Sequence, residues 1–278
     1  MDLIDRLIDL AFEEDLGASG DVTSRALVPP DAVGRGELWA KEPMVLSGLA
    51  TFARAFKRFD PALQVRFLMR DGERVDGKAK VAEVSGSMRS LLTAERTALN
   101  IVQRTCGIAT LARQAAEKVA GSRLKVLDTR KTSPGMRGLA KAAVVDGGGT
   151  NHRFGLSDGV LIKDNHLAAV GGSIRLALQR ARDSAPRLVK IEIEVTTLDQ
   201  LKEAVAEGAD IVLLDNMDDA TVAQAVALAG GKVELEVSGN VTLERLPKLA
   251  ALGVDFVSMG ALTHSARAVD LSLELVPA

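Results

Sequence analysis

A run of basic residues between Asp128 and His166 has the chemistry for binding a small molecule that carries several negative charges. It contains six lysines and arginines, at positions 130, 131, 137, 141, 153 and 163, and two of the three histidines of the chain. Glycines and turn residues lie among them, as in Gly147-Gly148-Gly149-Thr150-Asn151-His152-Arg153. Cationic side chains pair with carboxylates and phosphates, and glycine-rich turns expose backbone N–H groups. The stretch therefore predicts a pocket for a multiply anionic ligand.

Two other interpretations of these cations stay open at this point. Glycine-rich charged loops are often solvated turns, because lysine and arginine are mostly exposed. Surfaces that bind nucleic acids are usually basic and offer aromatic stacking. Here the net charge is −2, tyrosine is absent and aromatic residues are 3% of the chain, which disfavours nucleic acid.

The elements that must position these residues follow a regular rhythm after Leu124. Strand-like runs alternate with amphipathic helical segments every ~20 to 25 residues, the spacing of a βα barrel or a doubly wound sheet. Six such runs lie at 124–127, 159–162, 189–195, 211–214, 233–237 and 256–259. Each ends in a polar or small residue: Asp128, Lys163, Glu194, Asp215, Ser238 and Gly260. In a barrel these ends meet at one mouth, where active sites lie, so we predict an incomplete α/β barrel.

Two of these strands alternate aliphatic and ionisable residues. If the aliphatic faces pack against outer helices, the ionisable side chains point into the barrel. These are Lys190, Glu192, Glu194, Glu234 and Glu236. Buried charges need partner ions or metals, so inward-pointing charges would indicate a functional site. The alternative is that these are edge strands with one face exposed to solvent.

The part of the chain before Leu124 mixes strands and helices without a βα rhythm. Helical patterns cover 3–16, 49–59 and 93–121, and short strands fall within 33–47 and 63–84. Gly107 is a potential interruption of the longest helix. A single cysteine, Cys106, excludes an intramolecular disulfide. The acidic start of the chain is the opposite of the basic start of a signal peptide. No apolar run reaches the ~20 residues of a membrane span, so we predict a cytoplasmic protein.

Several motifs, in order along nearly the whole chain, resemble those of quinolinate phosphoribosyltransferases, the carboxylating nicotinate-nucleotide pyrophosphorylases of NAD biosynthesis. The motifs are Glu14-Asp15-Leu16-Gly17 with Gly20-Asp21-Val22-Thr23, Ala94-Glu95-Arg96-Thr97-Ala98-Leu99-Asn100, Asp128-Thr129-Arg130-Lys131-Thr132, Gly147 to Arg153 with Leu161-Ile162-Lys163-Asp164-Asn165-His166, and Gly260-Ala261-Leu262-Thr263-His264-Ser265. The resemblance implies a mixed α/β N-terminal sandwich domain at 1–105, joined by the C-terminal segment 266–278, and an incomplete α/β barrel at 106–265. It also implies a homodimer, with a larger homo-oligomer left open, in which each N-terminal domain covers the barrel mouth of the partner.

The resemblance also implies roles for individual residues. It assigns anion binding to Thr129, Arg130, Lys131, His152, Arg153 and Lys163, with Arg96 donated across the dimer interface. It places Glu194 and Asp215 near phosphoribosyl diphosphate and Mg²⁺. Their carboxylates would contact the metal directly or through the substrate. It assigns binding of the 5-phosphate to Ser238-Gly239-Asn240 and Gly260-Ala261. The residues expected to take part in catalysis are Lys131, Glu194 and Asp215.

The implied reaction joins the quinolinate nitrogen to ribose C1, releases diphosphate and then loses the 2-carboxylate as CO₂, which gives nicotinate mononucleotide. Arginines suit carboxylates and phosphates by bidentate geometry, and oxygen ligands suit Mg²⁺. Two departures from the family pattern are Ala140-Lys141-Ala142, where a Glu-Lys-Tyr trio is common, and Asn240, where a glycine is common. Two alternatives remain: a paralogous phosphoribosyltransferase acting on another pyridine, and a non-catalytic sugar-phosphate-binding barrel. His166 and His264 are interpreted as capping or core residues.

Overall fold

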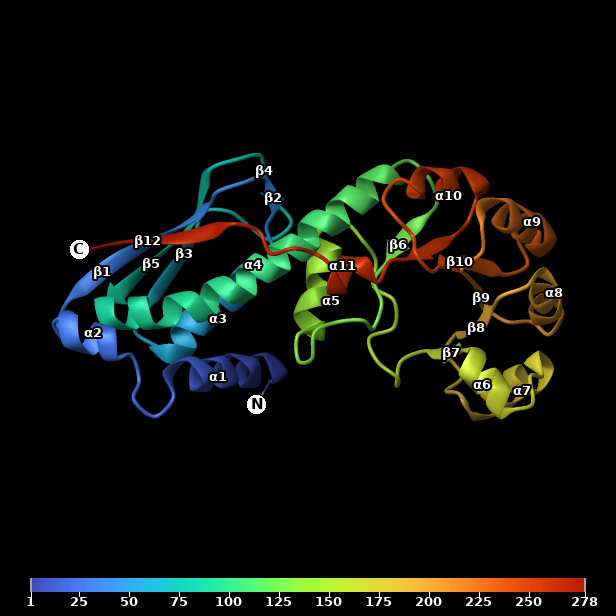
Figure 1. Cartoon of the computed structure of the whole chain (residues 1–278), viewed down its shortest axis with the longest axis horizontal. Helices are drawn as coiled ribbons and strands as arrows, with labels where there is room; N and C mark the ends of the chain where they lie inside the picture. Colours follow the sequence, from blue (N-terminus) through green and yellow to red (C-terminus); the bar gives the residue numbers. More distant parts are fainter. Residues whose placement is uncertain (1, 278) are drawn as a thin grey trace. The chain divides into compact units, whose positions relative to one another are not determined.

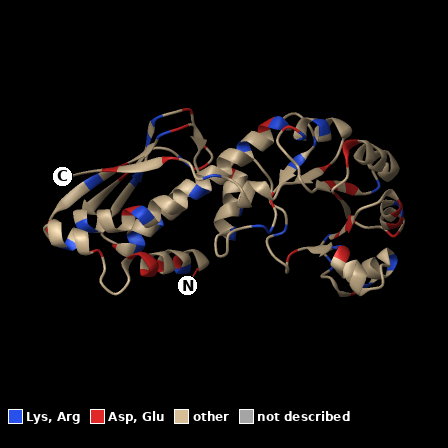
Figure 2. Cartoon of the chain, viewed as in Figure 1, with Lys and Arg blue, Asp and Glu red and all other residues tan. Residues whose placement is uncertain are grey.

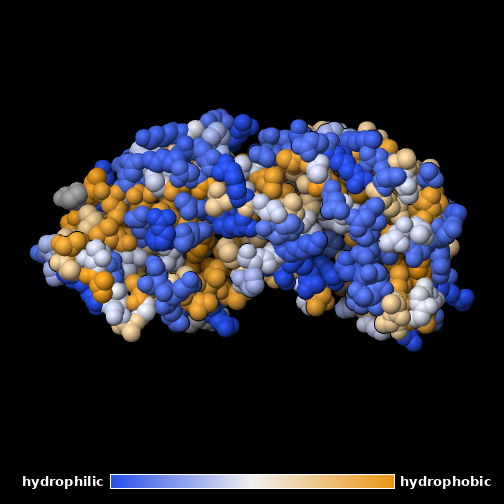
Figure 3. Space-filling model, viewed as in Figure 1, coloured by the Kyte–Doolittle hydropathy of each residue, from blue (hydrophilic) through white to orange (hydrophobic). Residues whose placement is uncertain are grey.

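The computed structural model describes residues 2–277, which divide into two compact units (Figure 1). Within the described residues, the first unit comprises the chain up to Arg113, residues 132–148 and everything from Leu262 onward; the second comprises residues 114–131 and 149–261. The domain boundaries predicted at 105/106 and 265/266 stay a prediction. Acidic and basic residues are interspersed in both units (Figure 2), and hydrophilic and apolar residues are intermixed on the face shown in Figure 3. Among the described residues, no helix combines the length and hydropathy that a membrane span requires.

The first unit is built on an antiparallel sheet whose strand order is β12-β1-β5-β3. These strands are β12 (Leu271–Pro277), β1 (Val33–Ala40), β5 (Ala79–Ser87) and β3 (Gln64–Phe67), and a small second sheet pairs β2 (Met44–Val45) with β4 (Arg74–Val75). The helices are α1 (Leu3–Leu16), α2 (Val22–Leu27), α3 (Leu49–Phe59), α4 (Met88–Lys118) and α5 (Arg137–Asp146). Phe52 and Phe56 of α3 pack edge to face with their ring centroids 5.0 Å apart, and both are fully buried in the core. The mixed α/β character predicted for this part of the chain is confirmed.

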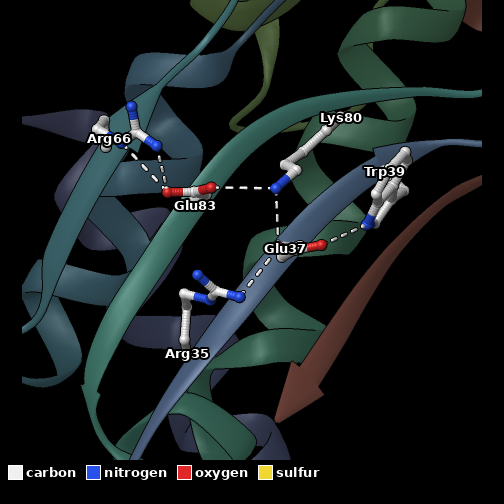
Figure 4. A network of polar contacts seen from close by, with 6 residues as sticks. All are labelled: Arg35, Glu37, Trp39, Arg66, Lys80 and Glu83. Atoms are coloured by element: carbon white, nitrogen blue, oxygen red, sulfur yellow. Dashed lines mark hydrogen bonds and ion pairs between the residues drawn. The ribbon is translucent and has the colours of Figure 1, made fainter. Parts of the chain in front are cut away.

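One face of this sheet carries a chain of ion pairs across three strands (Figure 4). Glu37 of β1 lies directly opposite Glu83 of β5, a placement of like charges that destabilises a sheet. Lys80 Nζ lies between the two carboxylates, 2.8 Å from Glu37 and 3.1 Å from Glu83. Arg66 and Arg35 extend the chain at its two ends, at 2.6 Å from Glu83 and 3.4 Å from Glu37. The cations thereby offset the repulsion between the paired glutamates.

The helix α4 runs through Gly107 without interruption, so the predicted break there is wrong. A Cβ atom added to Gly107 would lie 1.9 Å from the carbonyl oxygen of Arg267. The segment that contains Arg267 is held to α4 by hydrogen bonds from Arg104 to the carbonyl oxygens of Thr263 and Ala266. A glycine is therefore required for close approach of two backbones.

Gly107→Ala is expected to destabilise the protein by about 1–3 kcal/mol, because α4 or the segment around Arg267 must shift to make room for the methyl group. The matched control is Gly138→Ala in α5, where an added Cβ meets no atom within 4 Å and alanine favours the helix. Thermal or urea unfolding of the two variants measures the difference. Equal stability of the two would contradict the close approach at Gly107.

The second unit contains six parallel strands in the order β6-β11-β10-β9-β8-β7. They are β6 (Lys125–Leu127), β7 (Val160–Ile162), β8 (Ile191–Val195), β9 (Ile211–Asp215), β10 (Glu234–Ser238) and β11 (Phe256–Ser258). The helices of the second unit are α6 (Asp164–Ala169), α7 (Ile174–Ser184), α8 (Leu198–Ala206), α9 (Asp219–Ala229) and α10 (Leu246–Leu252). The short α11 (Ala261–His264) follows, and its residues from Leu262 onward belong to the first unit. Several begin at a side-chain cap, such as Ser173 before α7 and Asp218 before α9.

The ladder of this sheet is open, because β6 and β7 are its two edges and no pairing closes them within the described residues. A short segment lies along the free edge of β6: Thr150 donates its N–H to Val126 (2.8 Å) and accepts the N–H of Asp128 (3.2 Å). The prediction of an incomplete α/β barrel with parallel strands and helical connections is confirmed.

Candidate active site

A cavity of about 330 Å³ lies at the carboxyl ends of the parallel strands. It is lined by residues of five strands or the loops that follow them, and by two residues of the segment between α5 and β7, His152 and Arg153. The full lining is Thr129, Arg130, Lys131, His152, Arg153, Leu161, Lys163, Leu213, Glu236, Ser238 and Ser258. Seven of the residues predicted to bind substrate are among them, namely Thr129, Arg130, Lys131, His152, Arg153, Lys163 and Ser238. Strand register explains the convergence, since residues opposite each other in a ladder point to the same face, as Glu236 and Leu213 do.

Buried polar contacts hold the two basic loops at this mouth. Asp128 is fully buried at the end of β6 and accepts the backbone N–H of His152 at 3.0 Å. The guanidinium of Arg153 donates to the carbonyl oxygen of Gly159 at 2.9 Å. Burial lowers the pKa of Arg153, and the nearby positive charge of Arg130 lowers it further. Two guanidinium groups close enough to repel one another favour an anionic ligand between or beside them.

A cluster formed by His152, Glu192 and Glu236 lies inside the barrel below these cations. His152 Nε2 lies 3.2 Å from Glu192 Oε2 and 3.6 Å from Glu236 Oε2, and the glutamates are 4% and 1% exposed. Burial lowers the pKa of His152, but the two carboxylates raise it by more. Burial, followed by the charge of Glu192, raises the pKa of Glu236 to about 7.

One possible ligand atom from each of these three residues lies within 4.8 Å of the other two, close enough to hold a metal ion. Whether the cluster suits a metal depends on where the histidine carries its proton. The backbone N–H of Arg153 donates to His152 Nδ1 at 2.6 Å, so the neutral ring carries its proton on Nε2. The imidazolium form also carries a proton on Nε2, although its second proton, on Nδ1, would break the hydrogen bond from Arg153. In both forms the nitrogen that faces the carboxylates is a hydrogen-bond donor, and the cluster does not suit a metal ion.

The predicted acidic pair occupies neighbouring strands. Glu194 lies opposite Leu213, so Asp215, two residues further along β9, is on the same face of the sheet. Lys163 Nζ is 2.6 Å from Glu194 Oε2, and the side chain of Asn216 donates to Asp215 Oδ2 at 2.9 Å. Two carboxylates at adjacent strand ends are a donor set that suits Mg²⁺, which prefers oxygen ligands.

The loop Ser238-Gly239-Asn240 follows β10, and Ser238 lies opposite Asp215 in the ladder. Gly239 has φ of 92°, and an added Cβ would lie 2.2 Å from Asn216 Oδ1. Asn240 adopts the left-handed conformation with φ of 50°, which asparagine tolerates better than most residues. Its side chain donates to Asn216 Oδ1 at 3.3 Å. The asparagine that departs from the family pattern is thus accommodated in the loop.

Comparison with known proteins identifies the family. The model of the quinolinate phosphoribosyl transferase C-terminal domain matches residues 108–274, and that of the N-terminal domain matches residues 21–106. The chain belongs to the quinolinate phosphoribosyltransferase family. A probable carboxylating nicotinate-nucleotide pyrophosphorylase of Bacillus subtilis is 41% identical over 97% of this chain and 92% of that protein. The chloroplastic carboxylating nicotinate-nucleotide pyrophosphorylase of Arabidopsis thaliana is 40% identical over 97% of this chain and 82% of that protein.

Solved structures of the family have the same fold. The crystal structure of NadC from Streptococcus pyogenes has a TM-score of 0.94, with 41% identity over 99% of this chain and 97% of that chain. The nicotinate-nucleotide pyrophosphorylase from Francisella tularensis has a TM-score of 0.91, with 39% identity over 99% of this chain and 96% of that chain.

Seven of the predicted site residues do not line the strand-end cavity: Arg96, Glu194, Asp215, Gly239, Asn240, Gly260 and Ala261. Gly239 and Asn240 line another hollow, with Asn216. Arg96 belongs to the first unit, where it lines a separate hollow with Glu14, Asp15 and Asn100, and its side chain is 60% exposed. Gly260 and Ala261 follow β11 in the second unit but do not line the cavity.

The remaining sequence candidates have structural positions. His166 Nδ1 accepts the N–H of Lys163 at 2.9 Å, so His166 is a capping residue of α6, one of the two predicted alternatives. His264 lies 2.6 Å from the hydroxyl of Ser265. Lys141 of α5 is 3% exposed and belongs to the first unit, where alanines flank it in place of the family's Glu and Tyr.

Three of the five ionisable strand residues predicted to point inward are buried or nearly so, and the other two are exposed. Glu192 and Glu236 are buried, and the side chain of Glu194 is 10% exposed. Lys190 and Glu234 instead form an ion pair with each other, with side chains 62% and 41% exposed. They are the first ionisable residues of the two alternating stretches, near the amino ends of β8 and β10, where the sheet meets solvent. Glu236 was not predicted as a site residue, although its alternating position was the signal that could have identified it.

Proposed function

We propose that this chain is a quinolinate phosphoribosyltransferase, which transfers phosphoribose from 5-phosphoribosyl diphosphate to quinolinate and releases CO₂ and diphosphate. Its family membership and the cavity lined by Arg130, Lys131, Arg153 and Lys163 carry this proposal. Four cations around one cavity suit a dicarboxylate and a sugar diphosphate, because each anionic group needs a charge-assisted partner once it leaves water. The product would be nicotinate mononucleotide, a precursor of NAD.

The residues divide the chemistry between them. Arg130 and Arg153 would hold the carboxylates of quinolinate, which orients the ring nitrogen toward ribose C1. Departure of diphosphate leaves positive charge on the ribose, which Glu194 and Asp215 would stabilise while they orient its hydroxyl groups. Lys163, already 2.6 Å from Glu194, would hold that carboxylate in place by an ion pair. No covalent nucleophile is needed.

Mg²⁺ is the metal that this proposal requires. Glu194 and Asp215 would hold it together with oxygens of the diphosphate, directly or through the substrate. When bound, the ion would neutralise charge on the leaving diphosphate. The loop of Ser238, Gly239 and Asn240 would receive the 5-phosphate through its backbone N–H groups, with Gly260 and Ala261 beside it.

Asp215→Ala is expected to lower kcat/KM by about 100-fold or more while the fold persists, because it removes one of two carboxylates that act on the transition state. The matched control is Asp199→Ala, whose carboxylate is 91% exposed and pairs with Lys202 within α8. Activity of both variants is measured over a range of Mg²⁺ concentrations, with circular dichroism to confirm folding. Full activity of the wild type in excess chelator would remove the metal from the mechanism.

The proposal includes a homodimer in which Arg96 serves the active site of the partner. The exposed guanidinium of Arg96 supports this role, because an arginine in a hollow of the first unit is free to reach a second chain. Exposed apolar residues of the first unit, such as Leu10 at 61% and Leu92 at 37%, would supply apolar contact area.

One assay separates the proposal from its two alternatives. The purified protein is incubated with quinolinate, phosphoribosyl diphosphate and Mg²⁺, and nicotinate mononucleotide is measured by chromatography. Formation of that product supports the proposal. Turnover of another pyridine alone would favour the paralogous transferase, and binding of the sugar phosphate without turnover of any pyridine would favour a non-catalytic barrel.

A further inference from the structure

Glu236 is a buried carboxyl group that lines the strand-end cavity and has no role in phosphoribosyl transfer. Only 1% of the residue is exposed, and it lies in the middle of the inner face of β10. Its Oε1 atom has no hydrogen-bond partner among the described residues. A carboxylate inside a cavity built for anions would repel the substrate, whereas a carboxylic acid would not. The position of Glu236 therefore favours a group that carries a proton when substrate binds.

The groups around Glu236 determine whether its carboxyl group keeps its proton. Glu192 of β8 opposes ionisation by its charge, and His152 and the hydroxyl of Ser258 on β11 favour it. The cations Arg130, Lys131, Arg153 and Lys163 line the same cavity. His152 is 3.6 Å from Glu236 Oε2, too long for a hydrogen bond, whereas its 3.2 Å contact with Glu192 is within range. The histidine thus contacts Glu192 more closely than Glu236, and burial with the Glu192 charge places the pKa of Glu236 at about 7.

The second half of the reaction requires a proton at one carbon atom. When the bond between C2 and its carboxylate breaks, CO₂ leaves and the electron pair stays on C2, where the cationic ring nitrogen stabilises it. A proton must then form the new C2–H bond. The four cations of the cavity stay charged in order to hold the substrate, so an acid among them is the suitable donor.

We propose that Glu236 is the acid that protonates C2 of the pyridine ring when the 2-carboxylate leaves. This inference rests on the proposed function. The O–H bond of the Glu236 carboxyl group breaks, its proton and the electron pair on C2 form the C2–H bond, and Glu236 becomes a carboxylate. One proton from solvent restores the acid, so each turnover consumes one proton and releases one CO₂.

A second cavity offers the route for that proton. It measures about 280 Å³, and Glu192 and Glu236 line it together with Lys190, whose side chain is 62% exposed. Glu236 borders both cavities, one at the carboxyl ends of the strands and one that reaches this exposed lysine. Solvent can therefore reprotonate Glu236 without entering the substrate cavity.

The test compares Glu236→Gln with Glu234→Gln, a matched control on the same strand whose exposed side chain pairs with Lys190. Glutamine keeps the shape and the neutral state of the acid but has no proton to give. We expect kcat of E236Q to fall about 100-fold with KM for quinolinate within about 3-fold of wild type, because general acids typically contribute ~10²–10⁴ in rate. E234Q is expected to match the wild type.

Two further measurements distinguish proton donation from a structural role. Wild-type kcat is expected to fall as pH rises above about 7, because only protonated Glu236 is active, and this alkaline limb is expected to disappear in E236Q. In mixtures of H₂O and D₂O, the ratio of hydrogen to deuterium at C2 of the product is expected to differ between E236Q and wild type, because the donor has changed.

Each outcome decides one hypothesis. If neither the wild type nor E234Q converts quinolinate, the proposed function fails, whatever Glu236 does. If both convert it and E236Q has the same kcat, alkaline limb and isotope ratio, the role of Glu236 is overturned. Should E236Q fail to fold by circular dichroism, Glu236→Asp replaces it: a lower kcat with the alkaline limb retained supports the acid, and an unchanged kcat refutes it.

Discussion

Arg96→Ala and Lys131→Ala are each expected to be nearly inactive, yet a mixture of the two variants is expected to recover about a quarter of wild-type activity. Truncation of an arginine that faces a carboxylate in a covered site costs a few kcal/mol, since it leaves a buried anion unpaired. If Arg96 acts on the partner's barrel, a mixed dimer has one site with both defects and one site with neither. Random exchange makes about half of the dimers mixed, and half of their sites are intact.

The experiment mixes the two purified variants under conditions that exchange subunits, and then measures nicotinate mononucleotide formation. The formation of mixed dimers is confirmed separately, by mass spectrometry of differently tagged chains. Mixing Arg96→Ala with itself under the same conditions is the control. Confirmed exchange without recovery would show that Arg96 serves its own chain or no site at all.

Quinolinate is expected to be preferred over nicotinate by about 10⁴-fold or more in kcat/KM. Nicotinate lacks the 2-carboxylate, so it would leave cations such as Arg153 unpaired inside the cavity, and sites built to bind a polar group discriminate strongly against ligands that lack it. The burial that lowers the pKa of Arg153 makes an unpaired charge costly at this position.

The measurement is steady-state kinetics with each acid at saturating phosphoribosyl diphosphate. Arg153→Lys is a useful companion variant, because lysine keeps the charge but loses bidentate geometry. It is expected to bring the kcat/KM values for quinolinate and nicotinate closer together. Comparable kcat/KM for both acids in the wild type would contradict a site built for a dicarboxylate.

Local patterns in the sequence predicted much of this architecture. Helical periodicity located α1 at Leu3–Leu16, and the βα rhythm located the parallel strands, because both depend on residues close in the chain. Of the six residues predicted at the strand ends, Lys163 and Ser238 line the cavity, and Thr129, Arg130 and Lys131 follow β6 into it. These signals are local, because each lies in or directly after one strand.

Features that depend on distant contacts could not be predicted in this way. The need for glycine at position 107 comes from the carbonyl of Arg267, 160 residues later. The hydrogen bond between Asn240 and Asn216 and the cluster around Glu236 depend on strand register, which no single segment determines. The assignment of residues 132–148 to the first unit likewise depends on packing between remote parts of the chain.

The pairing of β1 with β12 has a consequence for synthesis on the ribosome. Ala40 ends β1 and Leu271 begins β12, yet the two residues are partners in the ladder. At ~5–20 residues per second, roughly 10 to 50 s pass between the emergence of the two strands. During that time β1 presents an unpaired edge, the kind of surface to which other nascent chains or chaperones bind. The six parallel strands of the second unit all emerge before β12, so the barrel can be complete while the sheet that begins the chain still waits for its last strand.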